Sequence, residues 1–396
     1  MGSKNLKHYL LMVLITVIMA LFTGGRIFYM FLILETILLE SMHYIQRKNA
    51  KNIFAFLDTM KREVYYGHRI RIKFDCYNSG ALPIAESVLS FSLENDYYNI
   101  PFRPVIASIK GYDRVVVKRE LYHGRRGLYN KGKITIDYLD PLHLFPRRLT
   151  YEQKIELLIY PRIQKLNFFY LPNAEYYGSH MVKNSNLEDY SSIKKIRKYH
   201  YGDSLKKVHW KITSKLNELY VKEYDLTANP KITLLVNGSY LDYSDENREI
   251  KVDLAVEVTV SIIDFTLKNN IETTIVYDFS MEKLIGKDYG AFKRILKSLT
   301  TFRGHLAIDF YDLVLKESQK LTKNAFLCLV TPTLNEALFN TLAQLGKNGV
   351  EISLILLNDE ERYQKEHISL LKALNIRCYF VEDQKGLVGA LEDIRS

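Results

Sequence analysis

Cysteine is scarce in this chain, with three among 396 residues. Cys76, Cys328 and Cys378 are far apart, they form no Cys-x-x-Cys pair, and no histidine stands at metal-ligand spacing from them. Zinc sites and disulfide frameworks need cysteines in closely spaced sets. The sequence therefore predicts neither, and it favours a reducing compartment.

The chain also lacks the short motifs of common enzyme classes. It has no Gly-x-Ser-x-Gly turn, no Gly-rich phosphate-binding loop, no Gly-x-Gly-x-x-Gly motif and no His-Glu-x-x-His motif. Asp203 and His209 could act as the orienting group and the base of a hydrolase, but no nucleophile is indicated. We therefore expect a protein that is not an enzyme and uses no cofactor, with the hydrolase as a less favoured alternative.

The overall composition is that of a folded protein. Hydrophobic residues make up 47% of the chain and charged residues 25%. The length is sufficient for two or three domains with cores of their own. The formal net charge of +10 suits a protein near anionic lipid or one that binds an acidic partner. It does not by itself indicate nucleic acid, and we expect no specific nucleic-acid partner.

Two apolar segments, 9–25 and 27–45, stand near the start of the sequence, with Gly24-Gly25-Arg26 between them. The first has about the minimum length of a membrane-spanning helix. A cleaved signal peptide is the alternative, but no Ala-x-Ala site follows and the second segment comes at once. We expect a transmembrane hairpin within residues 1–61 in the inner cell membrane. The flanking cations predict that both chain ends face the cytoplasm; they are Lys4, Lys7, Arg47, Lys48, Lys51, Lys61 and Arg62.

Glu35 would lie at membrane depth, where a carboxylate is by default a functional candidate. It could instead be neutral and hydrogen-bonded to Thr16 or Thr36, or reach the interface. We favour a structural role, because nothing else in the hairpin can relay a proton.

Residues 62–162 contain short runs of alternating apolar and polar residues separated by turns. Such runs predict strands with one buried face, and their spacing favours an antiparallel β-sandwich. The predicted strands are 69–77, 86–93, 114–121, 133–138 and 154–160. The polar, turn-rich stretch 163–195 is interpreted as a linker.

Residues 229–396 alternate between short apolar runs and longer helical patterns. This alternation predicts right-handed crossovers and a doubly wound α/β domain with a parallel sheet. The predicted strands are 231–236, 272–277, 325–331, 351–357 and 377–381, and the predicted helices are 249–269, 288–300, 334–346 and 363–374.

The segment 196–228 has the most unusual composition, because it holds the only tryptophan, a Gly202-Asp203 turn and many cations. Glycine supplies backbone freedom and aspartate can cap a following N–H, so that a helix is predicted over 204–216. On that helix Trp210 would lie one turn from Lys206, and Lys207 one turn from Lys211. The alternation over 218–224 predicts a strand.

This segment resembles the signature of a bacterial family called domain of unknown function 58. The residues that carry the resemblance are Arg197, Tyr199, Gly202, Asp203, Lys207, Val208, Trp210, Lys211 and Thr213, followed by Leu219-Tyr220-Val221-Lys222-Glu223. Two positions depart from the pattern, with Ser214 where alanine is common and Lys215 where arginine is common. A lysine there would grip a carboxylate less firmly than an arginine.

The resemblance implies a von Willebrand factor A-like domain over residues 229–396. It also implies a protein partner, since such proteins are commonly encoded beside MoxR-type AAA+ ATPases and transglutaminase-like membrane proteins. Tryptophan, tyrosine and arginine are enriched at binding hot spots. The predicted partner-binding residues are Arg197, Tyr199, Gly202, Asp203, Lys207, Trp210, Lys211 and Tyr220.

Domains of the A type often hold a divalent cation through an Asp-x-Ser-x-Ser motif, because hard cations prefer oxygen ligands. Here Asn237, Ser239 and Leu241 stand at those positions, so one charge and one hydroxyl are missing. We expect a degenerate site that binds no metal. Asp242, Asp245 and Glu246 could substitute, although an acidic loop is more often only solvated.

Two functions are therefore predicted. The first is a membrane-anchored, non-catalytic adaptor whose cytoplasmic domains bind protein partners. The alternative is a basic surface that binds nucleic acid or anionic lipid through Lys194, Lys195, Arg197, Lys198, Lys206, Lys207, Lys211 and Lys215. Salt dependence separates the two, because phosphate binding weakens steeply with ionic strength.

Overall fold

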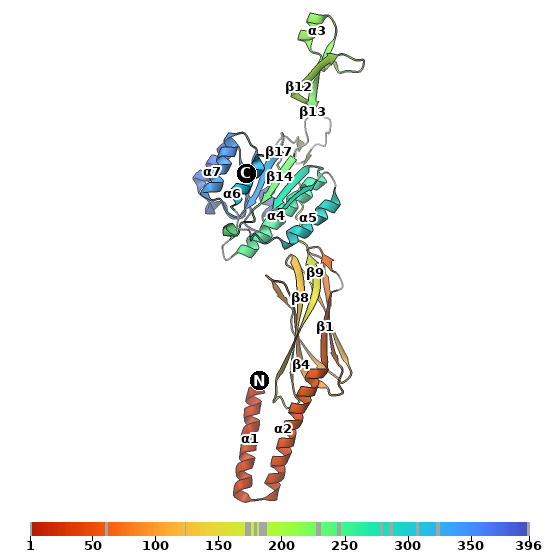
Figure 1. Cartoon of the computed structure of the whole chain (residues 1–396), viewed down its shortest axis with the longest axis vertical. Coiled ribbons are helices and arrows are strands. Elements are labelled where there is room, and N and C mark those ends of the chain that lie inside the picture. The colour runs from red at the N-terminus through yellow and green to blue at the C-terminus, as the bar shows by residue number, and fades with distance from the viewer. Residues whose placement is uncertain are drawn as a thin grey trace. The chain divides into compact units, whose positions relative to one another are not determined.

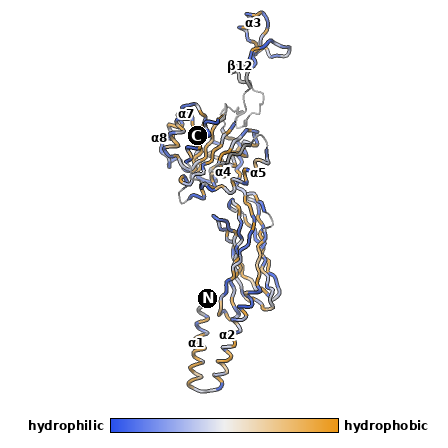
Figure 2. Tube along the Cα trace, in the orientation of Figure 1, coloured by the Kyte–Doolittle hydropathy of each residue, from blue (hydrophilic) through white to orange (hydrophobic). Residues whose placement is uncertain are grey.

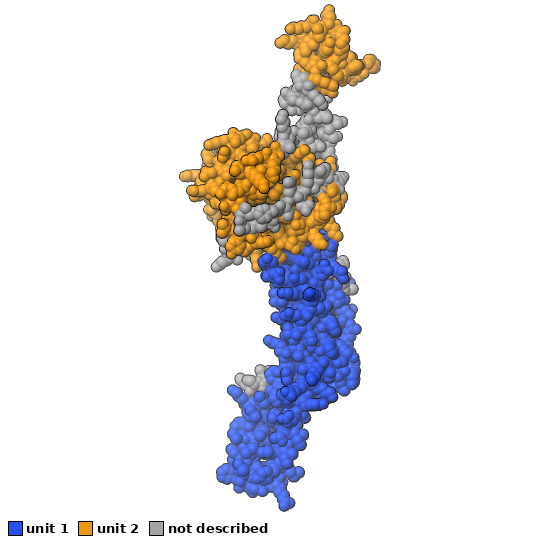
Figure 3. Space-filling model, in the orientation of Figure 1, with its two compact units in different colours: residues 1–162 blue, residues 163–396 orange. Residues whose placement is uncertain are grey.

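The computed structural model describes residues 2–59, 62–122, 124–170, 176–177, 180–181, 188–226, 231–243, 247–277, 280–284, 288–305, 309–321 and 325–393. The chain divides into two units, Met1–Arg162 and Ile163–Ser396, which Figure 3 colours blue and orange. The predicted ligand candidates Asp245 and Glu246 lie outside the described residues.

The first unit begins with a hairpin of two helices, α1 (Gly2–Thr23) and α2 (Arg26–Asn52) (Figure 1). Gly24 lies between them at φ 61°, a left-handed conformation that favours glycine. Both helices are long and apolar enough to cross a membrane, judged by length and composition. Figure 2 shows their apolar character, and many of their large apolar side chains are exposed. The two predicted apolar helices are thus confirmed.

Glu35 joins the two helices. The hydroxyl of Thr16 on α1 donates a hydrogen bond to Glu35 Oε1 over 3.1 Å, and the hydroxyl of Tyr9 donates to the Glu35 carbonyl oxygen over 2.6 Å. The predicted contact with Thr16 is therefore present, and it gives this carboxyl group a structural contact.

Two β-sheets make up the rest of this unit. The first has the order β1-β3-β7 and consists of β1 (Ile53–Thr59), β3 (Ile70–Asn78) and β7 (Arg114–Leu121). The second has the order β2-β9-β8-β4-β5, with β6 also paired to β4. Its strands are β2 (Glu63–Val64), β4 (Ile84–Glu94), β5 (Asn99–Pro101), β6 (Val105–Ile109), β8 (Gly127–Leu139) and β9 (Arg147–Ile159). Neighbouring strands of these two sheets are antiparallel except β2 and β9, which are parallel.

Alternate residues of both sheets share one hydrophobic core. Phe74 of β3, Phe91 of β4 and Ile134 of β8 belong to the same buried cluster. The rings of Phe74 and Phe91 stack with their centroids 5.4 Å apart. Because successive side chains of a strand point to opposite faces, the period-two pattern places these residues inside. The structure thus has two sheets packed around a common core, as the pattern predicts.

The strand β1 corrects the predicted boundary at residue 62. It follows α2 without a break, and it pairs with β3 from Ile53↔Asn78 to Thr59↔Ile72. Its outward residues Phe54 and Phe56 are as apolar as its inward ones. Because Phe54 and Phe56 stand where polar residues would mark the outer face, the sequence pattern shows no alternation and places the segment in the membrane hairpin.

A glutamine side chain pairs with the backbone of β1 at one residue. Gln153 of β9 accepts a hydrogen bond from the Leu57 N–H over 2.9 Å and donates one to the Leu57 carbonyl over 2.9 Å. Leu57 is buried, so water cannot replace these two bonds.

Replacing Gln153 by alanine should therefore loosen β1. Leaving a buried donor and acceptor unpaired costs roughly 1–3 kcal/mol, so the Leu57 amide should exchange its hydrogen at least about fivefold faster. Hydrogen exchange of the full chain, read by mass spectrometry over β1, measures this. The exposed Gln344→Ala serves as the matched control, and equal exchange in both variants would contradict the assigned role.

The second unit contains a six-stranded sheet in the order β16-β15-β14-β17-β18-β19. Its strands are β14 (Lys231–Val236), β15 (Glu272–Tyr277), β16 (Ser280–Leu284), β17 (Ala325–Thr331), β18 (Ile352–Leu356) and β19 (Arg377–Phe380). Five are parallel, and β16 pairs antiparallel with β15 at one edge. The predicted α/β architecture with a parallel sheet is confirmed.

Helices pack against this sheet. They are α4 (Arg248–Lys268), α5 (Tyr289–Thr301), α6 (Phe310–Ser318), α7 (Glu336–Lys347), α8 (Lys365–Ala373) and α9 (Leu387–Glu392). Leu235 of β14 shares a core with α6, α7 and α8. Its neighbours Leu234 and Val236 are equally buried, and strand geometry directs them to the opposite face. Both faces are thus covered, and β16, α6 and α9 are additions to the predicted elements.

Part of the predicted linker 163–195 belongs to this unit. The N–H of Gln164 donates to the Ser261 hydroxyl of α4 over 3.0 Å, and the Phe169 ring lies 6.3 Å from that of Phe265. The strand β12 (Glu188–Lys198) also begins inside the predicted linker. Composition concealed β12, because its apolar residues Ile193 and Ile196 stand singly among polar ones.

Candidate docking surface

A two-stranded antiparallel sheet carries the segment with the unusual composition. Strand β12 pairs with β13 (Tyr220–Leu226), with Arg197 opposite Val221 and Lys195 opposite Glu223. The N–H of Tyr199 donates to the Leu219 carbonyl over 2.9 Å and closes the base of the connection. We call residues 188–226 the hairpin module.

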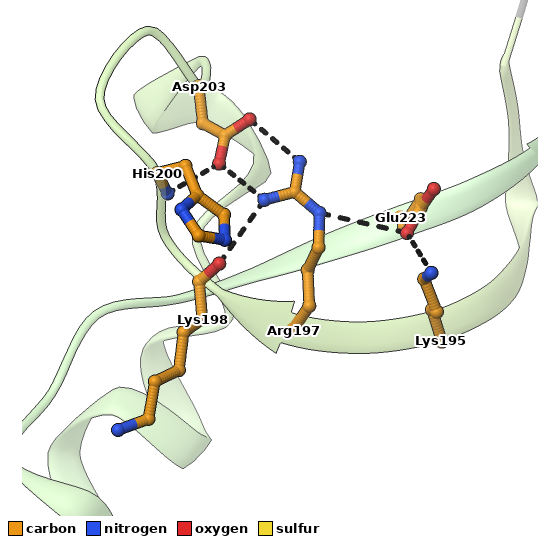
Figure 4. A network of polar contacts seen from close by, with 6 residues as sticks. All are labelled: Lys195, Arg197, Lys198, His200, Asp203 and Glu223. Atoms are coloured by element: carbon orange, nitrogen blue, oxygen red, sulfur yellow. Dashed lines mark hydrogen bonds and ion pairs between the residues drawn. The ribbon is translucent and has the colours of Figure 1, made fainter.

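An ion pair holds the turn that follows β12 (Figure 4). Two guanidinium nitrogens of Arg197 bind the two carboxylate oxygens of Asp203 over 2.7 and 2.8 Å. One of these oxygens also accepts the His200 N–H over 2.8 Å. Gly202 stands at φ 105°, where a side chain would be strained. A bidentate pair of this geometry fixes both direction and distance.

The hydrogen bond from Arg197, followed by that from the His200 N–H, lowers the pKa of Asp203 to about 2. The same pair raises the pKa of Arg197. Glu223 contacts the same guanidinium group, with an oxygen 3.7 Å from Arg197 Nε and 3.2 Å from Lys195 Nζ. The two cations and two anions balance in charge, and their mutual contacts restrict the motion of the turn.

The connection between the strands is not the single helix predicted over 204–216. A 3₁₀ turn, Leu205–Lys207, is followed by an isolated bridge between Val208 and Val221, and α3 begins only at Trp210 and ends at Leu216. Burial of Val208 under β13 breaks the helix, because its backbone has to adopt an extended conformation there. The predicted one-turn spacing of Trp210 from Lys206 is therefore wrong.

The N-cap of α3 is His209, not Asp203. The ring Nδ1 of His209 accepts the Ile212 N–H over 3.3 Å, while Asp203 binds back to Arg197 and to the His200 N–H. The predicted capping by Asp203 is thus wrong. Both members of the hypothetical hydrolase pair make structural contacts.

Large apolar side chains of the module face solvent. Trp210 is 68% exposed, Leu205 63% and Leu216 55%, and Tyr201 beside the glycine turn is fully exposed. No residue of α3 is buried. Lys206, Lys211 and Lys215 are exposed on the same module. We call Tyr201, Leu205, Trp210, Lys211 and Leu216 the module surface.

A second location lies at the carboxyl ends of β14 and β17, where the chain order along the sheet reverses. In doubly wound sheets this switch point is where ligands bind. In this chain a closed hydrogen-bond network occupies the switch point. The side-chain amide of Asn237 donates to Asp242 and to the Thr331 hydroxyl, each over 2.9 Å, and its oxygen accepts the Ser239 N–H over 2.8 Å.

The carboxylate of Asp242 is engaged on both oxygens. One accepts from Asn237, and the other accepts from the Thr333 hydroxyl over 2.6 Å. Leu241 is exposed and supplies no oxygen ligand from its side chain. Within the described part of the chain, no three His, Cys, Asp or Glu side chains form a group that could hold a metal ion. The amide of Asn237 donates to oxygens of the kind that bind cations.

Residues 195–361 match the family described as "Protein of unknown function DUF58". This segment belongs to the DUF58 family. It begins inside β12 and reaches past β18, so it includes the module surface and the Asn237 network.

The uncharacterized protein YeaD of Bacillus subtilis (strain 168) is 23% identical over 256 residues. The match covers 63% of this chain and 62% of that protein, which is less than two thirds of its length.

Similar solved structures are remote. Proximal thread matrix protein 1 from the mussel byssus is 12% identical, with 41% of this chain and 46% of that chain covered and a TM-score of 0.30. The CARDB domain of a Pyrococcus furiosus protein is 9% identical, with 27% and 86% covered and a TM-score of 0.21. Likeness at this level carries no functional argument.

Within the DUF58 segment, the predicted partner-binding residues separate into three groups. Arg197, Gly202 and Asp203 form the turn and its ion pair, and Tyr199, Lys207 and Tyr220 are half-buried. Only Trp210 and Lys211 are fully available at the surface.

Sequence reasoning missed Tyr201, Leu205 and Glu223. The position of Tyr201 beside the turn glycine Gly202 could have identified it, because turn residues lie on the surface.

The lowered pKa of Asp203 predicts a pH dependence of the module. Its contribution to stability is complete above the ordinary carboxyl pKa of 3.8 and is lost as the pH falls toward about 2. The resistance of the module to unfolding by urea, followed by the fluorescence of the sole tryptophan, Trp210, should therefore decrease between pH 5 and pH 2.5. The decrease should be smaller in Asp203→Asn. The exposed Glu218→Gln should behave like the parent. Identical pH dependence in parent and Asp203→Asn would contradict the assignment.

The network at the switch point predicts a conditional metal response. Asn237→Asp removes two donors and places two carboxylates side by side, so it should destabilise the domain by roughly 1–3 kcal/mol without divalent ions. Millimolar Mg²⁺ should recover part of this loss. The control Asn237→Ala should be destabilised without any Mg²⁺ response, and the parent should show none. Thermal melts with EDTA or Mg²⁺ measure this, and a Mg²⁺ shift in the parent would contradict it.

Proposed function

We propose that this protein is a membrane-anchored, non-catalytic adaptor that binds a protein partner through the module surface of its DUF58 segment. Helices α1 and α2 would be the anchor, with both chain ends on the cytoplasmic side. Residues 229–396 would form a von Willebrand factor A-like domain. The doubly wound strand order, with β14 in the centre, supports this last assignment.

The exposure of Trp210 carries the proposal. A tryptophan in a core seam would be buried, whereas this side chain is 68% exposed on a helix that has no buried residue. Leu205, Leu216 and Tyr201 are exposed nearby in sequence. Tryptophan and tyrosine dominate binding hot spots because they remove a large apolar area from water at low entropic cost.

The rigidity of the turn supports the same interpretation. The Arg197–Asp203 pair and the His200 N–H hold the turn that carries Tyr201. A surface that is already ordered loses less conformational entropy on binding. Ion pairs within the module engage Lys195, Arg197 and Lys198. Within the described part of the chain Lys211 forms no ion pair, so an acidic complement is favoured.

We infer a MoxR-type AAA+ ATPase as the partner, on the strength of the family resemblance. Nucleic acid or anionic lipid is the alternative, favoured by the exposed Lys206, Lys211 and Lys215. Binding to phosphates should fall by orders of magnitude between low and moderate salt, whereas an apolar hot spot should weaken only modestly.

The test compares two surface variants of the full chain. Trp210→Ala should change stability by less than about 0.5 kcal/mol, because the side chain is exposed, and it should weaken ATPase binding by at least about 2 kcal/mol. Lys211→Glu should weaken binding by charge reversal. Co-purification from detergent-solubilised membranes, with melting temperatures recorded in parallel, measures both.

Matched controls lie on α5, where Tyr289 and Lys297 are also exposed. Tyr289→Ala and Lys297→Glu should bind as the parent does. Loss of fold in Trp210→Ala together with unchanged binding in Lys211→Glu would leave the module as architecture only.

A further inference from the structure

One end of the β-sandwich is built directly onto α2. Strand pairing places Ile53 opposite Asn78, Leu139 opposite Glu86 and Arg147 opposite Tyr138. The turns 79–83, 110–113 and 140–146 therefore all lie at the end of the sandwich from which α2 emerges.

The contacts there leave no free linker between helix and sandwich. The His43 ring lies 5.6 Å from the Phe145 ring, and Gln46 Nε2 donates to the Phe145 carbonyl over 2.9 Å. The Asn52 carbonyl accepts from the N–H and the hydroxyl of Ser79 over 2.8 and 3.0 Å. Gln46 and Asn49 are buried by this packing, so the last turns of α2 and the sandwich form one piece.

The position of these contacts along α2 decides the depth of the turn 140–146. The apolar run of α2 ends at Leu39, before Glu40. His43 and Gln46 lie about 6 and 10.5 Å beyond Leu39 along the axis, at about 1.5 Å per residue. The headgroup layer of a bilayer is about 5–7 Å thick on each side. If α2 spans the bilayer, the turn that touches these two residues lies in or against the headgroup layer.

The exposed side chains at this end have interfacial chemistry. Tyr112 is 69% and Leu142 40% exposed. Arg47, Lys48 and Lys51 are exposed on the face of α2 opposite Gln46 and Asn49, and Lys110 is exposed beside Tyr112. Tyrosine, lysine and arginine are the residues enriched at membrane interfaces.

The acidic groups of this end offset these cations only in part. Asp140 is buried and accepts the N–H groups of Leu142 and Phe145. Glu86 lies 3.9 Å from His143 Nε2, and Asp113 accepts the Arg114 N–H.

The backbone presents Tyr112 rigidly. Tyr112 stands at φ 55°, a strained conformation for a residue with a side chain, and its N–H donates to the Gly80 carbonyl over 2.9 Å. A Cβ on Gly111 would lie 2.2 Å from the Ala81 carbonyl oxygen, so the two turns touch there. Strain of this kind persists only where the surroundings determine the conformation.

We propose that this end of the sandwich rests on the membrane surface, with Tyr112 and Leu142 at headgroup depth and Arg47, Lys48, Lys51 and Lys110 binding anionic phospholipid headgroups. The inference rests on the proposed membrane anchoring by α1 and α2. Unit 1 would then be a rigid body in direct contact with the bilayer surface, with no flexible linker between the membrane helices and the sandwich.

Fluorescent labels on single introduced cysteines test the proposal in the full chain, because Cys76, Cys328 and Cys378 are all buried. Tyr112→Cys marks the membrane-facing end, Tyr97→Cys the opposite end of the sandwich, and Phe22→Cys the tip of α1. The chain is reconstituted into vesicles of phosphatidylcholine, with or without phosphatidylglycerol. Lipids with a quencher on the headgroup or on the acyl chain are then added.

The label at residue 112 should be quenched by the headgroup quencher, more strongly with phosphatidylglycerol, and the label at residue 97 should not. Quenching at residue 22 by the acyl-chain quencher reports the anchor itself. An anchored chain with no quenching at residue 112 would overturn the inference and leave the anchor intact. No quenching at residue 22 would overturn both.

Charge variants test the lipid assignment. Lys48→Gln with Lys110→Gln should reduce the increment in quenching at residue 112 that phosphatidylglycerol adds, because two of the four cations are removed. Lys131→Gln with Lys154→Gln removes the same charge from an exposed pair near the other end of the sandwich, and it should retain the increment. Equal quenching at residue 112 in both vesicle types would overturn the binding of anionic headgroups.

Discussion

Buried backbone groups must keep their hydrogen-bond partners, and this constraint governs both units of the chain. Where strand pairing is incomplete, a side chain supplies the partner. Gln153 does so for the buried Leu57 and Asn237 for the buried Ser239 N–H, and Asp203 does the same for the exposed His200 N–H. Each of these polar residues is used internally, so its presence in a loop or turn does not indicate a ligand.

This distinction identifies which side chains are available for binding. Arg197 and Asp203 look like recognition residues in the sequence, yet each satisfies the other. Among the residues that the structure describes, Trp210, Tyr201 and Lys211 have no such internal partner, and all three are exposed to water. Trp210 is exposed together with Tyr201, Leu205 and Leu216, and several large exposed apolar side chains on one small module are typical of an interaction site. The adaptor proposal follows from this contrast between used and unused groups.

The same reasoning applies to the switch point of the parallel sheet. In doubly wound folds that place is open to ligands, but here Asn237 uses both amide hydrogens and Asp242 both oxygens. A cation there would have to displace the donors that now satisfy Asp242. The binding potential of the DUF58 segment is therefore argued from its hairpin module, and that of unit 1 from the end that joins α2.

The sequence by itself determined the apolar helices, the strands with one polar face and the alternating elements of the α/β domain, because each has a period that local sequence shows directly. It also identified Trp210 and the turn at Gly202. Tertiary structure decided the rest. Strand β1 is apolar on both faces, so only its pairing with β3 shows that it belongs to the sandwich. The predicted helix over 204–216 breaks because Val208 pairs with Val221, a contact between residues thirteen positions apart in sequence. The exposure of Trp210 and the pairing of Arg197 with Asp203 likewise depend on tertiary contacts, which local sequence periodicity does not show.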